Sequence, residues 1–289
     1  MTRKAFWLFV TSSILWGIPY GLIRIALNGF SPSSIVLARV VVGAIVLIPL
    51  AARRGVLASA LEQWKYVLAF ALVEMAGPWI LLTTAEQHIS SSLAGLLIGT
   101  VPFFGVPLAY FLGDKSIFHR RTILGLALGF GGVVALVGID AFSHAVNPIW
   151  IGAMLLAALG YAIAPAIADQ KLGKESSMAV AGLSMAMVAV VYAVPGSIGF
   201  GTINGHGAPI SAWLALLALG VLCTAVAFTS FFELIAQVGS ARATMIVYPN
   251  LTVAIIMGIV FLNEPITTGF LVGVPMVIVG SLLASRKHN

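Results

Sequence analysis

Two charged residues stand inside long apolar stretches and are the first candidates for chemistry. Glu74 lies in the stretch 65–86 and Arg39 in the stretch 34–52. At about 1.5 Å per residue, Glu74 would lie roughly 15 Å into a helix, near the middle of a hydrocarbon core about 30 Å thick. A carboxylate there must face a wet cavity, pair with a base or carry a proton. We therefore expect Glu74 to bind a substrate ammonium group or a coupling proton, unless it forms a structural ion pair with an arginine.

Arg39 carries the complementary charge. It lies about six residues, or roughly 9 Å, from the end of its helix. From there its guanidinium could bind a substrate carboxylate, pair with Glu74, or extend to the lipid headgroups. Arg24 stands only a few residues from a helix end, so we expect it to extend to the headgroups.

Hydroxyl and aromatic side chains recur on single faces of three further segments. In the first segment Ser13, Trp16, Tyr20 and Arg24 are spaced at i, i+3, i+7 and i+11. We predict a central substrate cavity lined by ten residues: Trp16, Tyr20, Arg39, Glu74, Trp79, Thr100, Tyr161, Thr244, Tyr248 and Asn250. Rings stack on apolar groups and attract cations, so this lining suits a small amphipathic solute. Ordinary helix packing is the alternative for each ring.

Six prolines stand inside these apolar segments, and we predict that they bend the helices: Pro19, Pro78, Pro102, Pro107, Pro165 and Pro249. A proline lacks the backbone N–H and clashes with the carbonyl four residues earlier. Pro249, for example, predicts a bend near Met245. The freed carbonyls must find partners in water, protein or substrate.

The composition indicates the element that carries these side chains. Of 289 residues, 60% are hydrophobic and 8% are charged, whereas a soluble domain has about 25% charged residues. Ten apolar segments have the length of a membrane-spanning helix: 5–27, 34–52, 65–86, 91–113, 122–139, 149–169, 178–197, 211–234, 241–262 and 266–285. Their length and unbroken apolarity exclude the alternating strands of a barrel. The sequence predicts an all-α polytopic membrane protein.

Several other classes of function are excluded by what the sequence contains. The net charge of +6 is spread in ones and twos along the chain, which argues against a nucleic-acid surface. The single cysteine, Cys223, excludes an internal disulfide. Neither a nucleophile–base arrangement nor a phosphate loop or metal-ligand cluster is visible. We expect no enzyme activity, no cofactor and no metal.

The distribution of Lys and Arg predicts the orientation. With the N-terminus inside, 13 of the 15 basic residues fall at the cytoplasmic side, and Arg24 and Arg39 lie within helices. Cytoplasmic loops carry an excess of Lys and Arg. We therefore expect both termini in the cytoplasm.

The two halves of the chain share a pattern. Glu86 and Pro102 are 16 residues apart, and so are Glu233 and Pro249. The letters FLGD at 111–114 correspond to FLNE at 261–264. These matches predict an internal duplication with domains 1–140 and 147–289. Each half has five helices, an odd number, so the second half would be inverted in the membrane, a common arrangement in secondary transporters.

A resemblance to a known family rests on Trp16-Gly17 in the first helix, on the mid-helix prolines of the fourth and ninth helices, and on the ending FLNEP at 261–265. In these features the chain resembles the drug/metabolite transporter superfamily, specifically its EamA-type members. The chain departs from that pattern at FLGDKS (111–116) and at Gly160-Tyr161. It looks most like bacterial exporters of amino acids, including aromatic ones. The resemblance implies a basket of helices around a central cavity, a small-molecule substrate, and efflux by alternating access, with protons as a candidate coupling ion. A drug or cationic amine exporter is the nearest alternative; an intramembrane enzyme or a scaffold is another.

Overall fold

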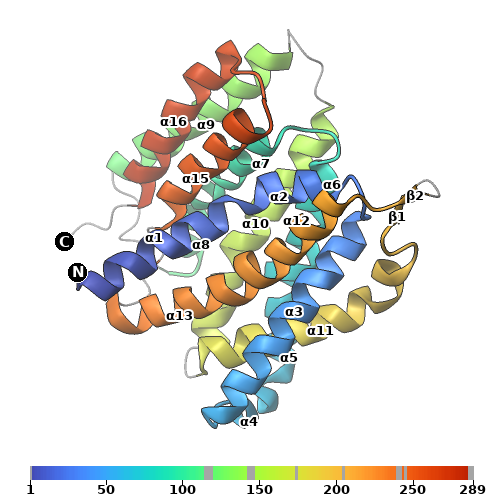
Figure 1. The fold of residues 1–289 in the computed structure, drawn as a ribbon. Coiled ribbons are helices and arrows are strands. Elements are labelled where there is room, and N and C mark those ends of the chain that lie inside the picture. Colours follow the sequence, from blue (N-terminus) through green and yellow to red (C-terminus); the bar gives the residue numbers. More distant parts are fainter. Residues whose placement is uncertain are drawn as a thin grey trace.

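The computed structural model describes residues 2–113, 120–141, 147–172, 175–203, 206–238, 243 and 246–285. In these residues the chain forms helices joined mostly by short connections (Figure 1). The elements of the first half are α1 (Arg3–Gly17), α2 (Pro19–Ala26), α3 (Pro32–Arg53), α4 (Leu57–Glu62), α5 (Trp64–Ala71), the π-helical turn η1 (Leu72–Ala76), α6 (Gly77–Ala85), α7 (Ser91–Ile98), α8 (Val101–Phe111) and α9 (Arg120–Ala141). Those of the second half are α10 (Pro148–Lys171), α11 (Ser177–Ser197), β1 (Thr202–Ile203), β2 (His206–Gly207), α12 (Ile210–Gly220), the π-helical turn η3 (Val221–Val226), α13 (Ala227–Val238), α15 (Val247–Ile256), the π-helical turn η5 (Met257–Phe261) and α16 (Thr268–Ser285).

In the part of the chain that the structure describes, each of the ten predicted apolar segments contains helix. Among the described residues, seven helical spans are long and apolar enough to cross a membrane: Arg3–Ala26, Pro32–Arg53, Trp64–Ala85, Ser91–Phe111, Pro148–Ala168, Ser177–Ser197 and Ile210–Val238. The other three segments appear as shorter apolar helices, at Thr122–Ala135, Pro249–Phe261 and Thr268–Gly280. The chain is therefore a helical, multi-pass membrane protein, while the number of ten crossings stays a prediction.

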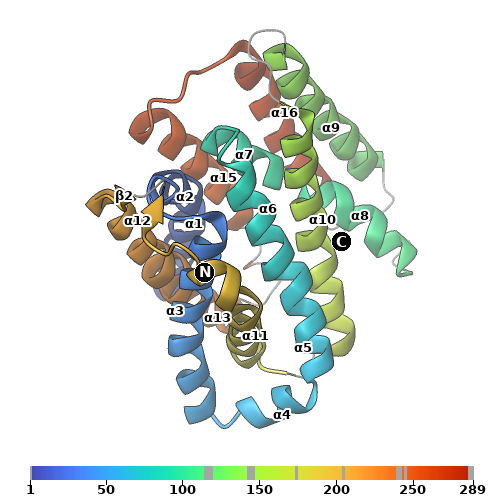
Figure 2. The same ribbon diagram turned by 90° about the vertical axis from the view of Figure 1, so that its right-hand side faces the viewer.

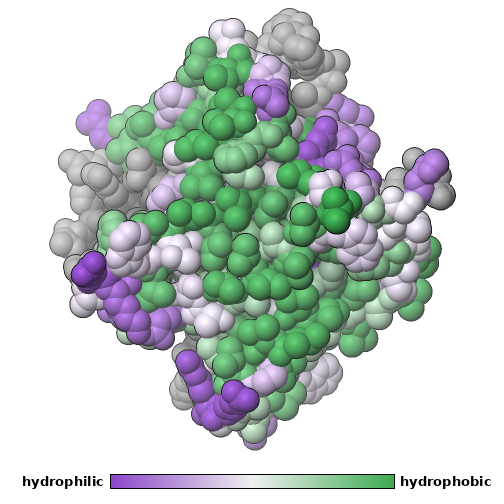
Figure 3. Space-filling model, in the orientation of Figure 1, coloured by the Kyte–Doolittle hydropathy of each residue, from purple (hydrophilic) through white to green (hydrophobic). Residues whose placement is uncertain are grey.

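The surface of the bundle is suited to lipid. Large apolar side chains are exposed on its outside, among them Phe111, Val190 and Ile210, which are 82%, 77% and 78% exposed. Figure 3 shows apolar side chains over the middle of one face, with hydrophilic side chains gathered towards its margins. Hydrocarbon rather than water is the solvent in which such a surface is stable.

Three helix breaks coincide with prolines. Pro19 is the first residue of α2, directly after the interruption at Ile18. Pro102 is the second residue of α8, after α7 has ended at Ile98. Pro78 is the second residue of α6 and follows η1. At Pro19 and Pro102 the missing N–H is one that would have no intrahelical partner in a first turn. At Pro78 the helix continues from η1, so the carbonyl of Glu74 lacks its usual donor.

The other three prolines do not interrupt their elements. Pro107 lies inside α8 and Pro165 inside α10. Pro249 is the third residue of α15. Met245, where we predict a bend, lies outside the described residues.

Helices from the two halves of the chain pack in pairs. The pairs are α3 with α11, α9 with α16, α1 with α13 and α15, and α10 with α6 and α8; Figure 1 shows α9 beside α16, and Figure 2 shows α10 beside α6. The contact of α9 with α16 is very close at Gly280, where an added Cβ would lie 2.6 Å from the carbonyl oxygen of Gly125. Small residues allow this approach of two backbones.

The segment 196–210 connects α11 to α12 and contains β1 and β2. These two-residue strands pair antiparallel, Thr202 with Gly207 and Ile203 with His206. Gly199 and Gly201, with φ of 62° and 76°, supply the left-handed turns before β1.

Candidate functional site

Arg39 of α3 lies at the centre of the candidate site. It is 7% exposed, and its Cζ lies 4.0 Å from the ring centroid of Trp79, which is on α6. Its Nε donates a hydrogen bond of 3.4 Å to Oγ1 of Thr224 in η3. The side chain does not extend towards a headgroup, so that alternative is wrong. A desolvated guanidinium over an indole ring is held in one orientation by the cation–π attraction.

Three further side chains complete a polar–aromatic cluster around Arg39. Tyr20 of α2, Tyr161 of α10 and Cys223 of η3 lie near enough for the Arg39 charge to act on them. The Trp79 side chain lies close enough to act on the Tyr161 hydroxyl. The sequence therefore identified Tyr20, Arg39, Trp79 and Tyr161 as neighbours, although they come from four different helices.

Glu74 lies on η1 at the edge of the same cluster. It is half-buried, and its charge acts on Tyr161. Within the described part of the chain, no ion pair involves Glu74, so the expected pairing of Glu74 with Arg39 is not formed. Both Arg39 and Glu74 act on Tyr161, so the site brings a basic and an acidic side chain within electrostatic range of one aromatic hydroxyl.

The π-helical turns η1 and η3 position the polar groups of the cluster. In η1 the N–H of Gly77 bonds to the carbonyl of Leu72, because Pro78 has no N–H to offer to the carbonyl of Glu74 four residues earlier. The hydroxyl of Tyr192, on α11, donates to the carbonyl of Ala76 at 2.9 Å. Such π-helical turns are frequent at functional sites.

In η3 the hydroxyl of Thr224 makes two bonds. It donates to the carbonyl oxygen of Leu219 at 2.8 Å and accepts the bond from Arg39. The sequence analysis missed Thr224, and Cys223 was used only to exclude disulfides. No proline marks η3, so the sequence carries no local signal for this turn.

Gly160 brings α10 against η1. A Cβ at this position would lie 2.6 Å from the carbonyl oxygen of Val73 and 2.8 Å from Cγ of Pro78. Only glycine permits this contact. The contact places the next residue, Tyr161, within electrostatic range of Glu74. The Gly160-Tyr161 pair, noted from sequence as a departure from the family pattern, is thus part of the site.

Trp16 is placed elsewhere. Its ring packs on Phe228 and Phe231 of α13, with centroid distances of 5.2 Å and 4.7 Å. The structure therefore puts Trp16 in the contact of α1 with α13 and not in the Arg39 cluster.

Four other predicted lining residues have separate surroundings or lie outside the described part. Thr100 is buried between α7 and α8, and its hydroxyl donates to the carbonyl of Leu97 at 2.6 Å. Asn250 lies where α15 meets α1, because its carbonyl oxygen would be 2.7 Å from a Cβ added to Gly17. Thr244 and the side chain of Tyr248 lie outside the described residues.

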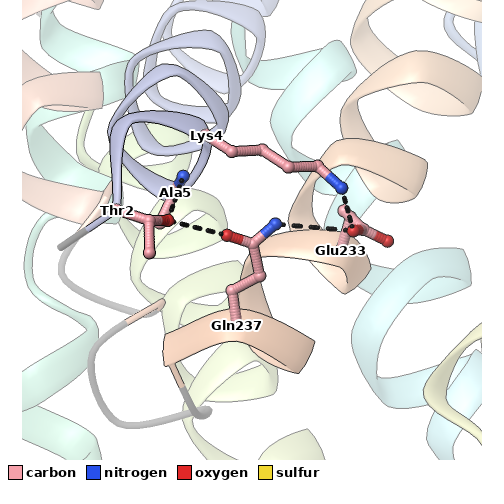
Figure 4. Close-up of polar contacts among 5 residues, drawn as sticks. All are labelled: Thr2, Lys4, Ala5, Glu233 and Gln237. Carbon is pink, nitrogen blue, oxygen red and sulfur yellow. Dashed lines mark hydrogen bonds and ion pairs between the residues drawn. The ribbon is translucent and has the colours of Figure 1, made fainter.

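A polar network joins the start of α1 to the end of α13 (Figure 4). The Lys4 ammonium lies 2.7 Å from Oε1 of Glu233. Gln237 donates to the same oxygen at 3.5 Å and accepts from the Thr2 hydroxyl at 3.1 Å. These bonds hold the two helices together at this end of the bundle.

At the opposite end of these helices, Glu264 of the FLNEP sequence caps α7. Its Oε1 accepts hydrogen bonds from the N–H and hydroxyl of Ser91 at 2.7 Å and 2.8 Å, and its Oε2 accepts from the N–H of Ser92 at 3.0 Å. A carboxylate is stabilised at a helix N-terminus by the free N–H groups and the helix dipole. Asn263, with φ of 53°, turns the chain so that Glu264 reaches α7.

Glu86, at the C-terminal end of α6, lies near this cap. Its side chain is 0% exposed, and neither carboxylate oxygen has a hydrogen-bond partner in the described part of the chain. The sequence analysis used Glu86 only as a marker of the repeat. Its burial could not be seen in a sequence that places it at the last position of the predicted apolar segment 65–86.

Comparison with known proteins identifies the family. The chain matches the EamA-like transporter family over residues 3–138 and again over 148–286. It is 26% identical over 288 residues to a "Probable terminal-alkyne amino-acid exporter" of Streptantibioticus cattleyicolor, covering 98% of this chain and 94% of that protein. It is also 24% identical to the uncharacterized inner membrane transporter YedA of Escherichia coli K12, covering 85% of this chain and 78% of YedA.

The fold is known from crystallography. One crystal structure, at 20% sequence identity, superposes with a TM-score of 0.68 and covers 98% of this chain and 97% of the other. The relatives of the present chain are named as transporters rather than enzymes. The family match extends over nearly the whole sequence. The chain belongs to the EamA-like transporter family.

Proposed function

We propose that this protein exports amino acids, including aromatic ones, across a bacterial inner membrane by alternating access. The observation that carries the substrate class is the buried guanidinium of Arg39 over Trp79. The name of the Streptantibioticus relative, a probable amino-acid exporter, supports the same substrate class.

Arg39 supplies the recognition of a carboxylate. Its planar face is occupied by Trp79 and its Nε by Thr224. In the described part of the chain, its two terminal nitrogens have no hydrogen-bond partner. They form the fork that binds both oxygens of a carboxylate.

Glu74 supplies the opposite charge and binds the ammonium group of the amino acid. It is half-buried and has no ion-pair partner in the described part of the chain, so a cation can reach it. Tyr161 lies near both Arg39 and Glu74, and Tyr20 lies near Arg39. Trp79 offers a further ring. An apolar or aromatic side chain of the substrate would pack on these rings.

The proposed mechanism requires two inverted five-helix halves and ten membrane crossings. Three observations support this arrangement: the two family matches, the pairing of helices between halves, and the left-handed residues that follow α8 and η5. These are Gly113, with φ of 105°, and Asn263, with φ of 53°, which stand at the same place in FLGD and FLNE. The halves would exchange conformations as the site opens to either side.

The orientation follows from charge. Lys and Arg concentrate at one side of the predicted topology, so both termini would be cytoplasmic. Lys4 and Glu233 would then close the cytoplasmic end, and Glu86 and Glu264 would lie at the external end.

A drug or cationic amine exporter is the competing function, and Glu74 is the observation that favours it. A buried arginine beside the site repels a cation that has no carboxylate. Counterflow in proteoliposomes distinguishes the two functions. We expect labelled amino acids, and not the amines that lack only the carboxylate, to exchange. Exchange of the amines alone would refute the amino-acid assignment.

A further inference from the structure

Glu86 is a buried carboxylate whose chemistry the proposed substrate site does not use. Its side chain is 0% exposed, and both its oxygens lack a hydrogen-bond partner in the part of the chain that the structure describes. Thr83, one turn earlier on α6, is likewise fully buried with an unpartnered hydroxyl. Buried polar groups are normally paired, and an unpaired one calls for an explanation.

Within the described part of the chain, neither of the two arginines near Glu86 forms an ion pair with its carboxylate. Arg24 of α2 donates to the backbone carbonyl of Glu86 and not to its carboxylate. Arg39 of α3 acts on Glu86 from a distance while held by Trp79 and Thr224.

The nearest carboxylate adds to the cost of an ionised Glu86. Glu264 acts on Glu86 with a like charge and is already bonded to the first turn of α7. Tyr20 of α2 also lies within electrostatic range, and from α10 Trp150 stacks at 4.0 Å on His88, two residues beyond Glu86.

We propose that Glu86 is a proton-binding site, and that its protonation permits the packing of α6, α7 and the Glu264 cap seen here. An ionised, unpaired carboxylate beside a second carboxylate would not stay in a water-free position. Loss of the proton would therefore open this end of the bundle, and water would solvate both charges. The step is a simple proton transfer, in which the carboxylate and a proton from the aqueous side give the neutral acid.

This site would make the external end respond to the pH outside, a role that rests on the proposed function. Low pH favours the closed external end, and high pH favours the open one. In the predicted orientation the proton enters from outside when the amino acid has left, the closed, protonated end then permits the opposite end to open, and the proton returns to the outside when the external end opens again. Proton binding itself does not depend on the identity of the substrate, so it can be tested alone.

The single cysteine provides the probe. Cys223 is fully buried beside Arg39, so a maleimide reaches it only when the bundle opens. We would measure its labelling rate in lipid nanodiscs from acid to alkaline pH, in the wild type, Glu86→Gln, Glu74→Gln and Glu62→Gln. Glu86→Gln mimics the protonated acid and keeps the same thiol, so dividing by its rate removes the titration of the thiol itself.

We expect the ratio of the wild-type rate to the Glu86→Gln rate to rise with pH, by up to about tenfold per pH unit, the slope for linkage to one proton. Glu62→Gln, on the exposed helix α4, should follow the wild type, and so should Glu74→Gln. A flat ratio for the wild type, or a ratio that rises for the wild type and stays flat for Glu74→Gln, would overturn the proposal. So would a response to Na⁺ in place of pH, or a Glu86→Gln protein that does not fold. A failed substrate assay with an intact slope would refute only the amino-acid assignment.

Discussion

Replacing Glu264 by Gln tests how the FLNEP sequence stabilises the fold. In the structure Oε1 receives two bonds from Ser91, and Oε2 receives one from the N–H of Ser92 at 3.0 Å. A glutamine keeps one acceptor oxygen but turns an NH₂ group towards the N–H of Ser92. The lost charge-assisted bond is worth about 1.5–3 kcal/mol, and the lost charge at the helix N-terminus about 0.3–1 kcal/mol.

We therefore expect Glu264→Gln to lower the free energy of unfolding by about 2–4 kcal/mol. The measurement is thermal unfolding of the purified protein in detergent, where the midpoint should fall by several degrees. Glu62→Gln, the same chemical change on exposed α4, is the matched control and should leave the midpoint unchanged. Equal midpoints for Glu264→Gln and the wild type would refute a stabilising role of the cap.

Three other substitutions test contacts of the site. Tyr192→Phe removes the bond to the Ala76 carbonyl and should lower the free energy of unfolding by about 1 kcal/mol, measured by thermal unfolding. Gly160→Ala places a Cβ against the Val73 carbonyl, so the unfolding free energy should fall by about 1–3 kcal/mol in the same assay; an unchanged midpoint would contradict that contact. Trp79→Leu removes the ring below Arg39, a contact worth about 2 kcal/mol, and should raise the KM for exchange in proteoliposomes; an unchanged KM would argue against a role of this ring.

The sequence was most informative where one physical constraint dominates. The hydrocarbon core demands continuous helix, so the apolar segments and their ends were predictable within a few residues, as for 34–52 and α3 (Pro32–Arg53). The interruption between α7 and α8 lies directly before Pro102. Intramembrane charge likewise identified Arg39 and Glu74, because any such residue needs a special environment.

Side-chain partners across the bundle were not predictable from helical faces alone. Ser13, Trp16 and Tyr20 share a face by spacing, yet α1 ends at Gly17 and α2 begins at Pro19. Tyr20 consequently lies within electrostatic range of Arg39, while Trp16 packs on Phe231. A helical wheel drawn through the break assumes a continuous helix that the chain does not form.

The residues missed altogether depend on tertiary contacts. Thr224 became a partner of Arg39 through the turn η3, which no sequence signal marks. Glu86 is the last residue of the predicted segment 65–86, where an exposed carboxylate is ordinary, and only the packing of α6 against its neighbours makes it fully buried.

The most direct test of the account is whether Arg39 holds the carboxylate of the substrate. In proteoliposomes, counterflow of a labelled amino acid should be lost or its KM raised roughly thirtyfold or more in Arg39→Gln, because removing one partner of a buried charge pair costs about 2–5 kcal/mol. Arg54→Gln, at an exposed position, should transport like the wild type. Wild-type amino-acid exchange by a folded Arg39→Gln protein would contradict the proposed site.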